Sequence, residues 1–248
     1  LLRKPLTGWR YLLQPPSRVV HMRDRHLWKL RLQAPSIGRM LTGQAPSAAR
    51  GTEHGEAPLW ISPKDEAHVD QLCRRWGVAN QRPLVVICPG ARSHIKRWTS
   101  EGFAQVAQRL IRDAHAQVVF SGEPSEEEIV EEVLGLMDQP AHSAVGLTTI
   151  RQAAALMRRA ALVITNDSAS LHMASAVGAP TVAIFGPTHA DRYGPTAPQR
   201  RTIRRRLFCA PCEVSLCRFS HECMRFIGAD EVYEAARDLL GRNVAQHA

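Results

Sequence analysis

The sequence lacks any apolar run of the roughly eighteen residues that a membrane-crossing helix needs. Its first residues, Leu1-Leu2-Arg3-Lys4-Pro5, lack the long apolar core of a signal peptide. No strand-like segment is followed by G-x-G-x-x-G, the phosphate-binding turn of dinucleotide-dependent oxidoreductases. We therefore expect a globular, cytoplasmic protein that is not an oxidoreductase of that class.

Acidic residues are fewer than basic ones, 23 against 32, which gives a formal net charge of +9. The excess is uneven, because five arginines fall within seven positions: Arg200, Arg201, Arg204, Arg205 and Arg206. Such a cluster is either a solvated basic loop or a site for an anionic partner, such as nucleic acid, a phosphorylated lipid or a membrane surface. A basic binding module without a working active site is therefore one functional alternative.

The first 80 residues contain few regular signals, and the stretch 31–58 is rich in Gly, Pro, Ala and Ser, which is typical of a loop or linker. From Pro83 onward, strand and helix patterns alternate. We expect strands at 84–88, 117–121, 143–145, 162–165 and 182–185. We expect helices that begin near 99 and 125, and at 150–159, 169–177 and 230–240. Alternation of this kind predicts an α/β fold with a parallel sheet, whose ligand site lies beyond the carboxyl ends of its strands.

Two of the helix starts have specific signatures. Thr99 can cap the first helix while Trp98 and Phe103 occupy the two positions of a hydrophobic staple. Ser125 and Glu128 have the spacing of a capping box for the second helix.

The loop after the first strand, Pro89 to Trp98, carries Lys96. A lysine at this position suits a phosphate, since its ammonium can neutralise charge that grows on a departing phosphate group. A lone lysine in a basic protein is also commonly an ordinary surface residue.

The loop after the second strand, Gly122 to Glu126, places Glu126 in the first turn of a helix. Its carboxylate can accept hydrogen bonds from ribose hydroxyls. Glu126, Glu127 and Glu128 would also stabilise the helix dipole without any ligand.

The segment Thr165 to His172 leaves a strand and enters a helix, whose free N–H groups favour an anion such as a diphosphate. Ser168, Ala169 and Ser170 are small enough to let a ligand approach the backbone, although Ser168 can equally be an ordinary cap. His172, near Asp167, can hold a phosphate or hydroxyl, or it can be a core histidine packed with Leu171 and Met173.

Taken together, PGARSHIKRW, GEPSEE, TNDSASLHMASAVGAPTVAIFGPT and the cysteine-rich tail resemble glycosyltransferase family 9, the heptosyltransferases of lipopolysaccharide core assembly. The resemblance runs from about Pro83 to Leu240. It implies a GT-B fold of two Rossmann-like domains that face one cleft. In this chain, residues 81–248 would be the complete C-terminal, donor-binding domain, and residues 1–80 a partial acceptor-side domain with a linker.

The resemblance implies an inverting transfer of a heptose or related sugar from an ADP-sugar to a lipid-linked anionic saccharide at the inner membrane surface. No metal, other cofactor or nucleic acid is expected. By position, Lys96 would contact the donor phosphates, Glu126 the adenosine ribose and Thr148 the adenine. Asp167, Ser168, Ala169 and His172 would contact the diphosphate and the sugar.

Two features depart from the family pattern. Ala169 stands where many relatives have glycine, which narrows the approach to the phosphate. The family opens with a strand and a glycine-aspartate loop whose aspartate is thought to be the general base, and nothing in residues 1–80 matches it. We therefore expect this chain alone to lack the base, and a sugar-nucleotide epimerase of related architecture is a second enzymatic alternative.

Four of the six cysteines, Cys209, Cys212, Cys217 and Cys223, form the pattern C-x2-C-x4-C-x5-C. Thiolates at this spacing can make a tetrahedral zinc site, and stable disulfides are disfavoured in a reducing cytoplasm. Structural zinc, reduced packing cysteines and a disulfide all remain open, with reduced cysteines the most favoured.

Overall fold

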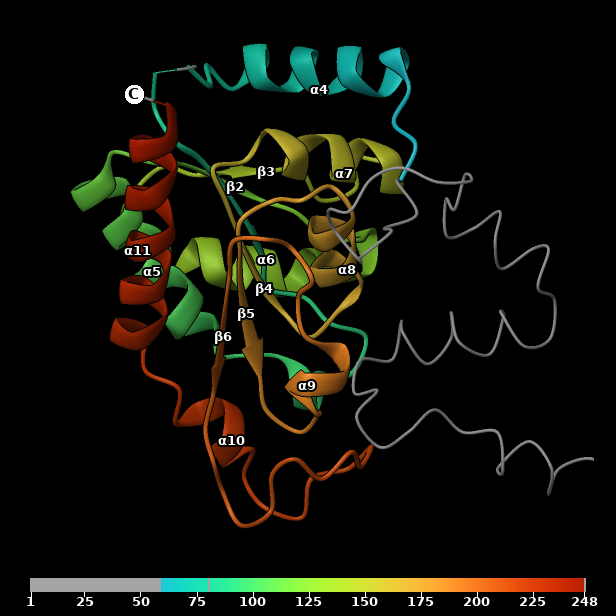
Figure 1. The fold of residues 1–248 in the computed structure, drawn as a ribbon, viewed down its shortest axis with the longest axis vertical. Helices are drawn as coiled ribbons and strands as arrows, with labels where there is room; N and C mark the ends of the chain where they lie inside the picture. The colour runs from blue at the N-terminus through green and yellow to red at the C-terminus, as the bar shows by residue number, and fades with distance from the viewer. Residues whose placement is uncertain (1–58, 80, 248) are drawn as a thin grey trace, which may run out of the picture. The chain divides into compact units, whose positions relative to one another are not determined.

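A computed structural model of the chain describes residues 59–79 and 81–247, and the expected loop at 31–58 lies outside the described residues. Six parallel strands form one sheet in the order β3-β2-β1-β4-β5-β6 (Figure 1). The strands are β1 (Leu84–Cys88), β2 (Gln117–Phe120), β3 (His142–Ser143), β4 (Leu162–Asn166), β5 (Thr181–Phe185) and β6 (Arg200–Arg204). The α-helices are α4 (Pro63–Arg75), α5 (Ser100–Ala114), α6 (Glu127–Gly135), α7 (Ile150–Arg159), α8 (Ala169–Ala176), α9 (Ala190–Tyr193), α10 (Glu222–Arg225) and α11 (Ala229–His247), and short 3-10 turns span His94–Lys96 and Pro124–Glu126.

The central strands β1, β4 and β5 are buried along their whole length and largely apolar, because both faces of the sheet are covered. Along β1, Val85 and Ile87 belong to one buried cluster, whereas Val86 and Cys88 belong to another. A strand that is buried on both faces reads as a continuous apolar run, and this is why β1, β4 and β5 are recognisable in the sequence. The expected α/β fold with a parallel sheet is confirmed.

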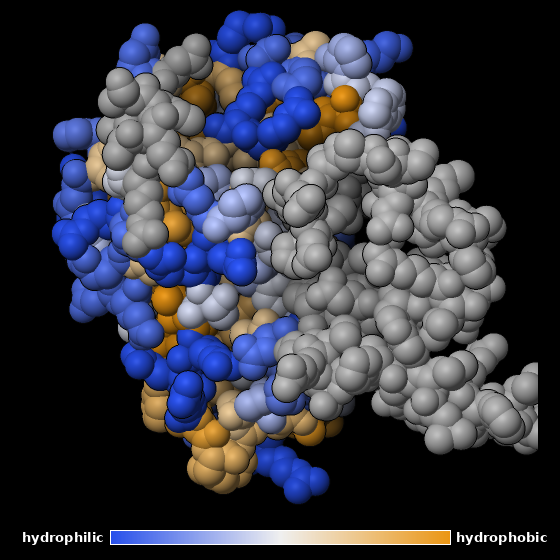
Figure 2. Space-filling view, viewed as in Figure 1, coloured by the Kyte–Doolittle hydropathy of each residue, from blue (hydrophilic) through white to orange (hydrophobic). Residues whose placement is uncertain are grey.

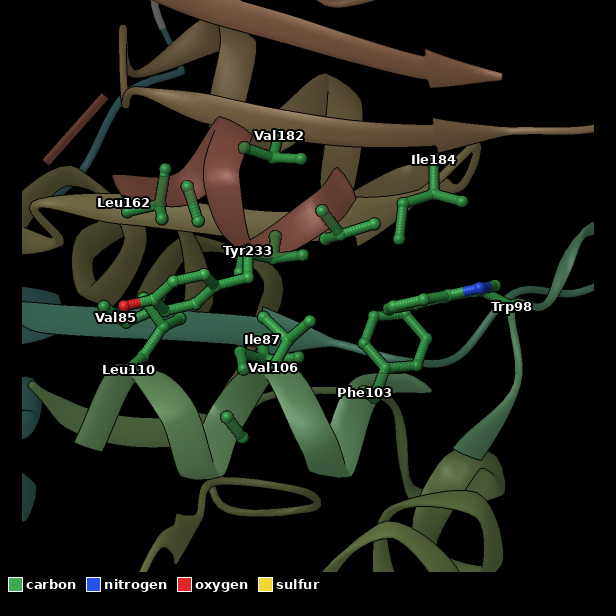
Figure 3. Close-up of a cluster of buried hydrophobic side chains, with 14 of the residues drawn as sticks. Val85, Ile87, Trp98, Phe103, Val106, Leu110, Leu162, Val182, Ile184 and Tyr233 are labelled. Atoms are coloured by element: carbon green, nitrogen blue, oxygen red, sulfur yellow. The ribbon is translucent and has the colours of Figure 1, made fainter. Parts of the chain in front are cut away.

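The first cluster lies between the sheet and helices α5, α6 and α11. Figure 3 shows part of it, with Phe103 and Leu110 pointing from α5 toward strand residues such as Ile87. The predicted start of α5 is confirmed: the Thr99 side chain accepts a hydrogen bond from the Gly102 amide at 3.1 Å. The rings of Trp98 and Phe103 pack edge to face, with centroids 5.0 Å apart, as a hydrophobic staple requires.

The second cluster joins the other face of the sheet to α7, α8 and α4. Helix α4 was not expected, although Ser62 and Asp65 form a capping box at its start and Pro63 occupies the first turn. It is a largely polar helix that buries only Asp65, Val69 and Leu72. Its apolar stripe is therefore too narrow to be recognised as a helical pattern in the sequence.

Ion pairs supplement this narrow contact between α4 and α7. Arg159 forms ion pairs with Glu66 and Asp70. Nε of Arg151 lies 3.4 Å from Oδ2 of Asp65. Helix α4 belongs to the same compact unit as the sheet.

Two local expectations are wrong. Ser125 and Glu128 do not form a capping box; Pro124 opens a 3-10 turn instead, and the Glu126 carboxylate accepts a hydrogen bond from the Glu123 amide at 3.0 Å. The basic cluster is not a solvated loop, because residues 200–204 form β6, which pairs with β5 along its whole length.

Strand β6 was not recognised in the sequence because it consists mainly of charged residues. Of its five residues only Ile203 is buried, and the arginines are exposed or half-buried. Charged side chains are typical of edge strands, since they discourage pairing with a second sheet. Arg201 forms an ion pair with Asp238, and Arg205 forms one with Glu231; both acidic residues are on α11. Part of the positive charge of the cluster is therefore neutralised by ion pairs within the fold.

The C-terminal helix was predicted at 230–240, and α11 extends from Ala229 to His247. Among the helices of the described segments, none combines the length and the apolar character that a bilayer crossing requires.

Candidate functional site

The site residues gather where the strand order reverses. From β1 the chain adds β2 and β3 on one side, and it then returns to place β4, β5 and β6 on the other. A crevice forms at such a switch point, outside the carboxyl ends of the two central strands. Lys96 follows β1 and Asp167 follows β4, and Nζ of Lys96 lies 2.7 Å from Oδ2 of Asp167.

This ion pair is half enclosed. Asp167 is 6% exposed and Lys96 31% exposed, so the carboxylate is shielded while the ammonium reaches solvent. The hydroxyl of Thr188 donates a second hydrogen bond to Oδ2 of Asp167, at 2.7 Å. Thr188 lies in the loop after β5. A loop that follows a strand is expected at the crevice, but the sequence does not show the contact of Thr188 with Asp167. Lys96 is therefore held in place rather than being a freely moving surface lysine.

Asn166, at the end of β4, joins the loop after β1 to the loop after β4. Its side-chain amide donates to the carbonyl of Pro89 at 2.7 Å, and its carbonyl accepts from the Trp98 amide at 3.0 Å. Asn166 is fully buried. The sequence analysis did not single it out, although a buried polar residue at the end of an apolar strand is a signal of such a bridge.

Glu126 lies against the glycines of two loops. A Cβ at Gly90 would be 2.1 Å from Oε1 of Glu126, and a Cβ at Gly122 would be 2.8 Å from its Oε2. The Glu126 carboxylate therefore packs directly against the backbone of both glycines. Burial raises the pKa of Glu126 above its ordinary value. The carboxyl is thus packed into the site rather than being only a solvated helix-start residue.

We expect Glu126→Gln to raise stability near neutral pH. Burial raises the pKa of Glu126, so the stability linked to this group is present below the ordinary Glu pKa and is lost as pH rises through the raised value. Glutamine carries no charge, so the variant escapes this loss. Thermal unfolding from about pH 4 to about pH 8 measures the difference, which should grow with pH. A pH-independent difference between the two proteins would contradict this account.

The start of α8 is open to a ligand. Ser168 is its N-cap residue but makes no side-chain capping bond; its hydroxyl lies 3.3 Å from that of Thr165. Ala169 and His172 are both exposed. The interpretation of His172 as a core histidine is therefore wrong, because Leu171 and not His172 faces the interior. The first-turn N–H groups of α8 are left without the cap that Ser168 would otherwise supply.

Thr148 is half-buried, in the loop between β3 and α7. The strand order places four loops in a row along the edge of the sheet: those of Thr148, Glu126, Lys96 and Asp167. An elongated ligand could therefore contact all four in that order.

The four clustered cysteines line a single cavity of about 340 Å³, with Ile95 and Pro187 on its wall. All four are free thiols. Burial, with a further contribution from the other three thiols, raises the pKa of Cys223 to about 11, so it is protonated at neutral pH. Within residues 59–79 and 81–247, no three His, Cys, Asp or Glu side chains are placed to hold a metal ion.

A hollow larger than the cysteine-lined cavity, about 1380 Å³, lies at the opposite edge of the sheet, next to residues that precede strands, such as Pro83, Pro180 and Gln199. Ligands of parallel α/β sheets bind at the carboxyl edge instead. We therefore assign the candidate site to the carboxyl edge.

The model of a protein family described as glycosyltransferase family 9 (heptosyltransferase) matches residues 24–222. The chain belongs to this family. The match includes every candidate site residue from Lys96 to His172, and it extends N-terminally to residue 24, beyond the point where the sequence resemblance began.

The chain is also similar to curated heptosyltransferases. It is 29% identical over 209 residues to lipopolysaccharide heptosyltransferase 2 of Salmonella typhimurium, and 30% identical over 213 residues to that of Escherichia coli. Each alignment covers 80% of this chain and 58% of the relative. The chain thus spans a little over half the length of these relatives.

Solved structures show the same fold. ADP-heptose lps heptosyltransferase II of E. coli superposes with a TM-score of 0.63 and 26% identity, covering 79% of this chain and 56% of that one. A family 9 glycosyltransferase of Veillonella parvula superposes with a TM-score of 0.74 and 23% identity, covering 91% and 61%. The fold is that of the GT-B heptosyltransferases, and the described sheet is its Rossmann-like domain.

Proposed function

We propose that this protein transfers a heptose or related sugar from an ADP-sugar to a lipopolysaccharide core acceptor, with inversion at the anomeric carbon. The observation that carries the proposal is the Lys96–Asp167–Thr188 cluster at the switch point, beside the open start of α8. A cation next to a helix N-terminus that lacks a side-chain cap is what a diphosphate requires.

Each part of the donor has a matching feature along the edge of the sheet. The diphosphate would lie between Lys96 and the start of α8, where Ser168, Ala169 and His172 face solvent or are half-buried. Glu126 would accept hydrogen bonds from the ribose hydroxyls, and the Thr148 loop would contact the adenine. This arrangement follows the order of the loops, β3-β2-β1-β4.

Asp167 has a positioning role in this proposal. A carboxylate placed directly on a diphosphate would be repelled, but Asp167 instead binds Lys96 and Thr188 through the same oxygen, Oδ2. Its Oδ1 makes no hydrogen bond within the described segments and can accept one from a hydroxyl of the donor sugar.

The acceptor hydroxyl would attack the anomeric carbon from the side opposite the diphosphate. A new carbon–oxygen bond forms, the bond to the ADP oxygen breaks, and the proton passes to a base outside the described residues. Lys96 would neutralise the charge that grows on the departing ADP. The acceptor is a lipid-linked anionic saccharide in this proposal, so the protein would work in the cytoplasm at the inner membrane surface.

The test is calorimetric titration of the chain with ADP and, separately, with UDP. ADP should bind, and UDP should bind at least about tenfold more weakly, since its pyrimidine is smaller than the adenine that the Thr148 loop would contact. A folded chain that binds neither nucleotide, or binds both equally, would overturn the donor assignment.

A further inference from the structure

The segment between β6 and α10, residues 205–221, exposes large apolar side chains. We call it the β6–α10 loop. Phe208 is 92% exposed and Leu216 72% exposed, and Val214 and Phe219 are also exposed. Figure 2 shows hydrophobic residues gathered at the end of the molecule where this loop lies in Figure 1. Such a concentration of exposed apolar side chains marks an interaction surface in a protein of this size.

Three of these apolar residues, Phe208, Val214 and Phe219, lie together rather than being scattered along the loop. The rings of Phe208 and Phe219 meet edge to face, with centroids 5.4 Å apart, so the two halves of the loop come together. Val214 and Phe219 also line the cavity that holds the four clustered cysteines. The patch is therefore held in shape by contacts within the loop.

Unpaired positive charge lies in this loop and in the adjoining helix α10. Arg206, Arg218 and Arg225 are exposed, and none has an ion-pair partner among the residues with described side chains. In contrast, Arg201 and Arg205 are paired with acidic residues of α11. The stretch from Arg204 to Phe226 contains five arginines and two glutamates. Exposed arginines in the same segment as exposed apolar side chains are complementary to an anionic lipid surface, where headgroups bind arginine and aromatic rings enter the interface.

The loop also has a suitable position. It leaves the carboxyl end of β6, the edge of the sheet that carries the candidate site. Its cavity includes Ile95 and Pro187, which are the immediate chain neighbours of Lys96 and Thr188. A membrane that bound the loop would therefore lie near the site.

We propose that the β6–α10 loop docks this protein on an anionic membrane, with Phe208, Leu216 and Phe219 at the lipid interface and Arg206, Arg218 and Arg225 at the headgroups. The proposal rests on the proposed function for its purpose, since docking there brings the donor site to a lipid-linked acceptor. A single-stranded nucleic acid is the competing partner, because aromatic side chains and arginines also bind stacked bases.

The test is co-sedimentation of the full chain with phosphatidylcholine vesicles, with and without phosphatidylglycerol. Binding should require phosphatidylglycerol and weaken as salt is raised. The double variant Phe208→Ser/Leu216→Ser and the triple variant Arg206→Gln/Arg218→Gln/Arg225→Gln should each lose about tenfold or more in vesicle affinity. The matched control is Ile150→Ser, because Ile150 is 67% exposed but lies at the start of α7.

ADP titration of the same proteins separates the two proposals. The loop variants should bind ADP as the wild type does, because they change no residue of the donor site. A wild type that binds ADP but not anionic vesicles would overturn the docking proposal alone. Equal loss of vesicle binding in Ile150→Ser, or tight binding to oligonucleotides without vesicle binding, would also overturn it.

Discussion

Replacing Lys96 with alanine is expected to weaken ADP binding by about 10- to 100-fold, the usual worth of a charged hydrogen bond in a shielded site. The removed ammonium lies 2.7 Å from Asp167 and is the cation that we place on the donor diphosphate. Its loss would leave Asp167, which is 6% exposed, with Thr188 as its remaining partner. Titration calorimetry measures the change.

Lys64→Ala is the matched control, since it removes the same charge from an exposed position on α4. Its ADP affinity should equal that of the wild type. A double-mutant cycle with Asp167→Asn then tests the positioning role of Asp167. If Asp167 acts through Lys96, its substitution should matter less when Lys96 is already alanine. Full additivity, or an unchanged affinity in Lys96→Ala, would refute these assignments.

Asn166→Ala is expected to lower the free energy of unfolding by about 2–4 kcal/mol, because it leaves a buried carbonyl at Pro89 and a buried amide at Trp98 without partners. The two loops that carry Lys96 and Asp167 would also separate more easily, so ADP affinity should fall with stability. Urea-induced unfolding monitored by tryptophan fluorescence gives the first quantity, and calorimetry the second.

Asn166→Asp serves as the internal comparison. A carboxylate can still accept the hydrogen bond from the Trp98 amide, but it cannot donate to the Pro89 carbonyl and would be repelled by it. We expect a destabilised protein whose loss reflects mainly the Pro89 contact. If Asn166→Ala cost less than about 0.5 kcal/mol, the usual range for a surface substitution, Asn166 would not be the bridge described above.

The sequence predicted those elements whose pattern follows from burial. Strands β1, β4 and β5 are apolar because both faces of the sheet are covered, and Thr99 and Trp98 together identified the start of α5. Strand β6 and helix α4 were missed because each is stabilised by partners far away in the chain. Arg201 finds its partner on α11 and Glu66 its partners on α7, and no local pattern shows such pairs.

The same distinction applies to the site. Lys96 and Asp167 could be selected because each follows a strand and has suitable chemistry, yet they are 71 positions apart and their contact depends on the pairing of β1 with β4. The bridging role of Asn166 depends on the same pairing, whereas the contact of Thr188 with Asp167 depends on the pairing of β4 with β5. Glu126 was selected from its place after β2, but its close approach to Gly90 required the three-dimensional arrangement.

The pairing of β1 with β4 also has a kinetic consequence. Val85 pairs with Leu162, so the centre of the sheet closes only after a long intervening segment is ordered, whereas β1 with β2 and β4 with β5 join over much shorter separations. Folding can thus build two halves, β1–β3 and β4–β6, before they meet. Lys96 belongs to the first half, and Asn166 and Asp167 belong to the second. A donor bound by residues of both halves would therefore stabilise the contact between the halves and slow their separation during unfolding.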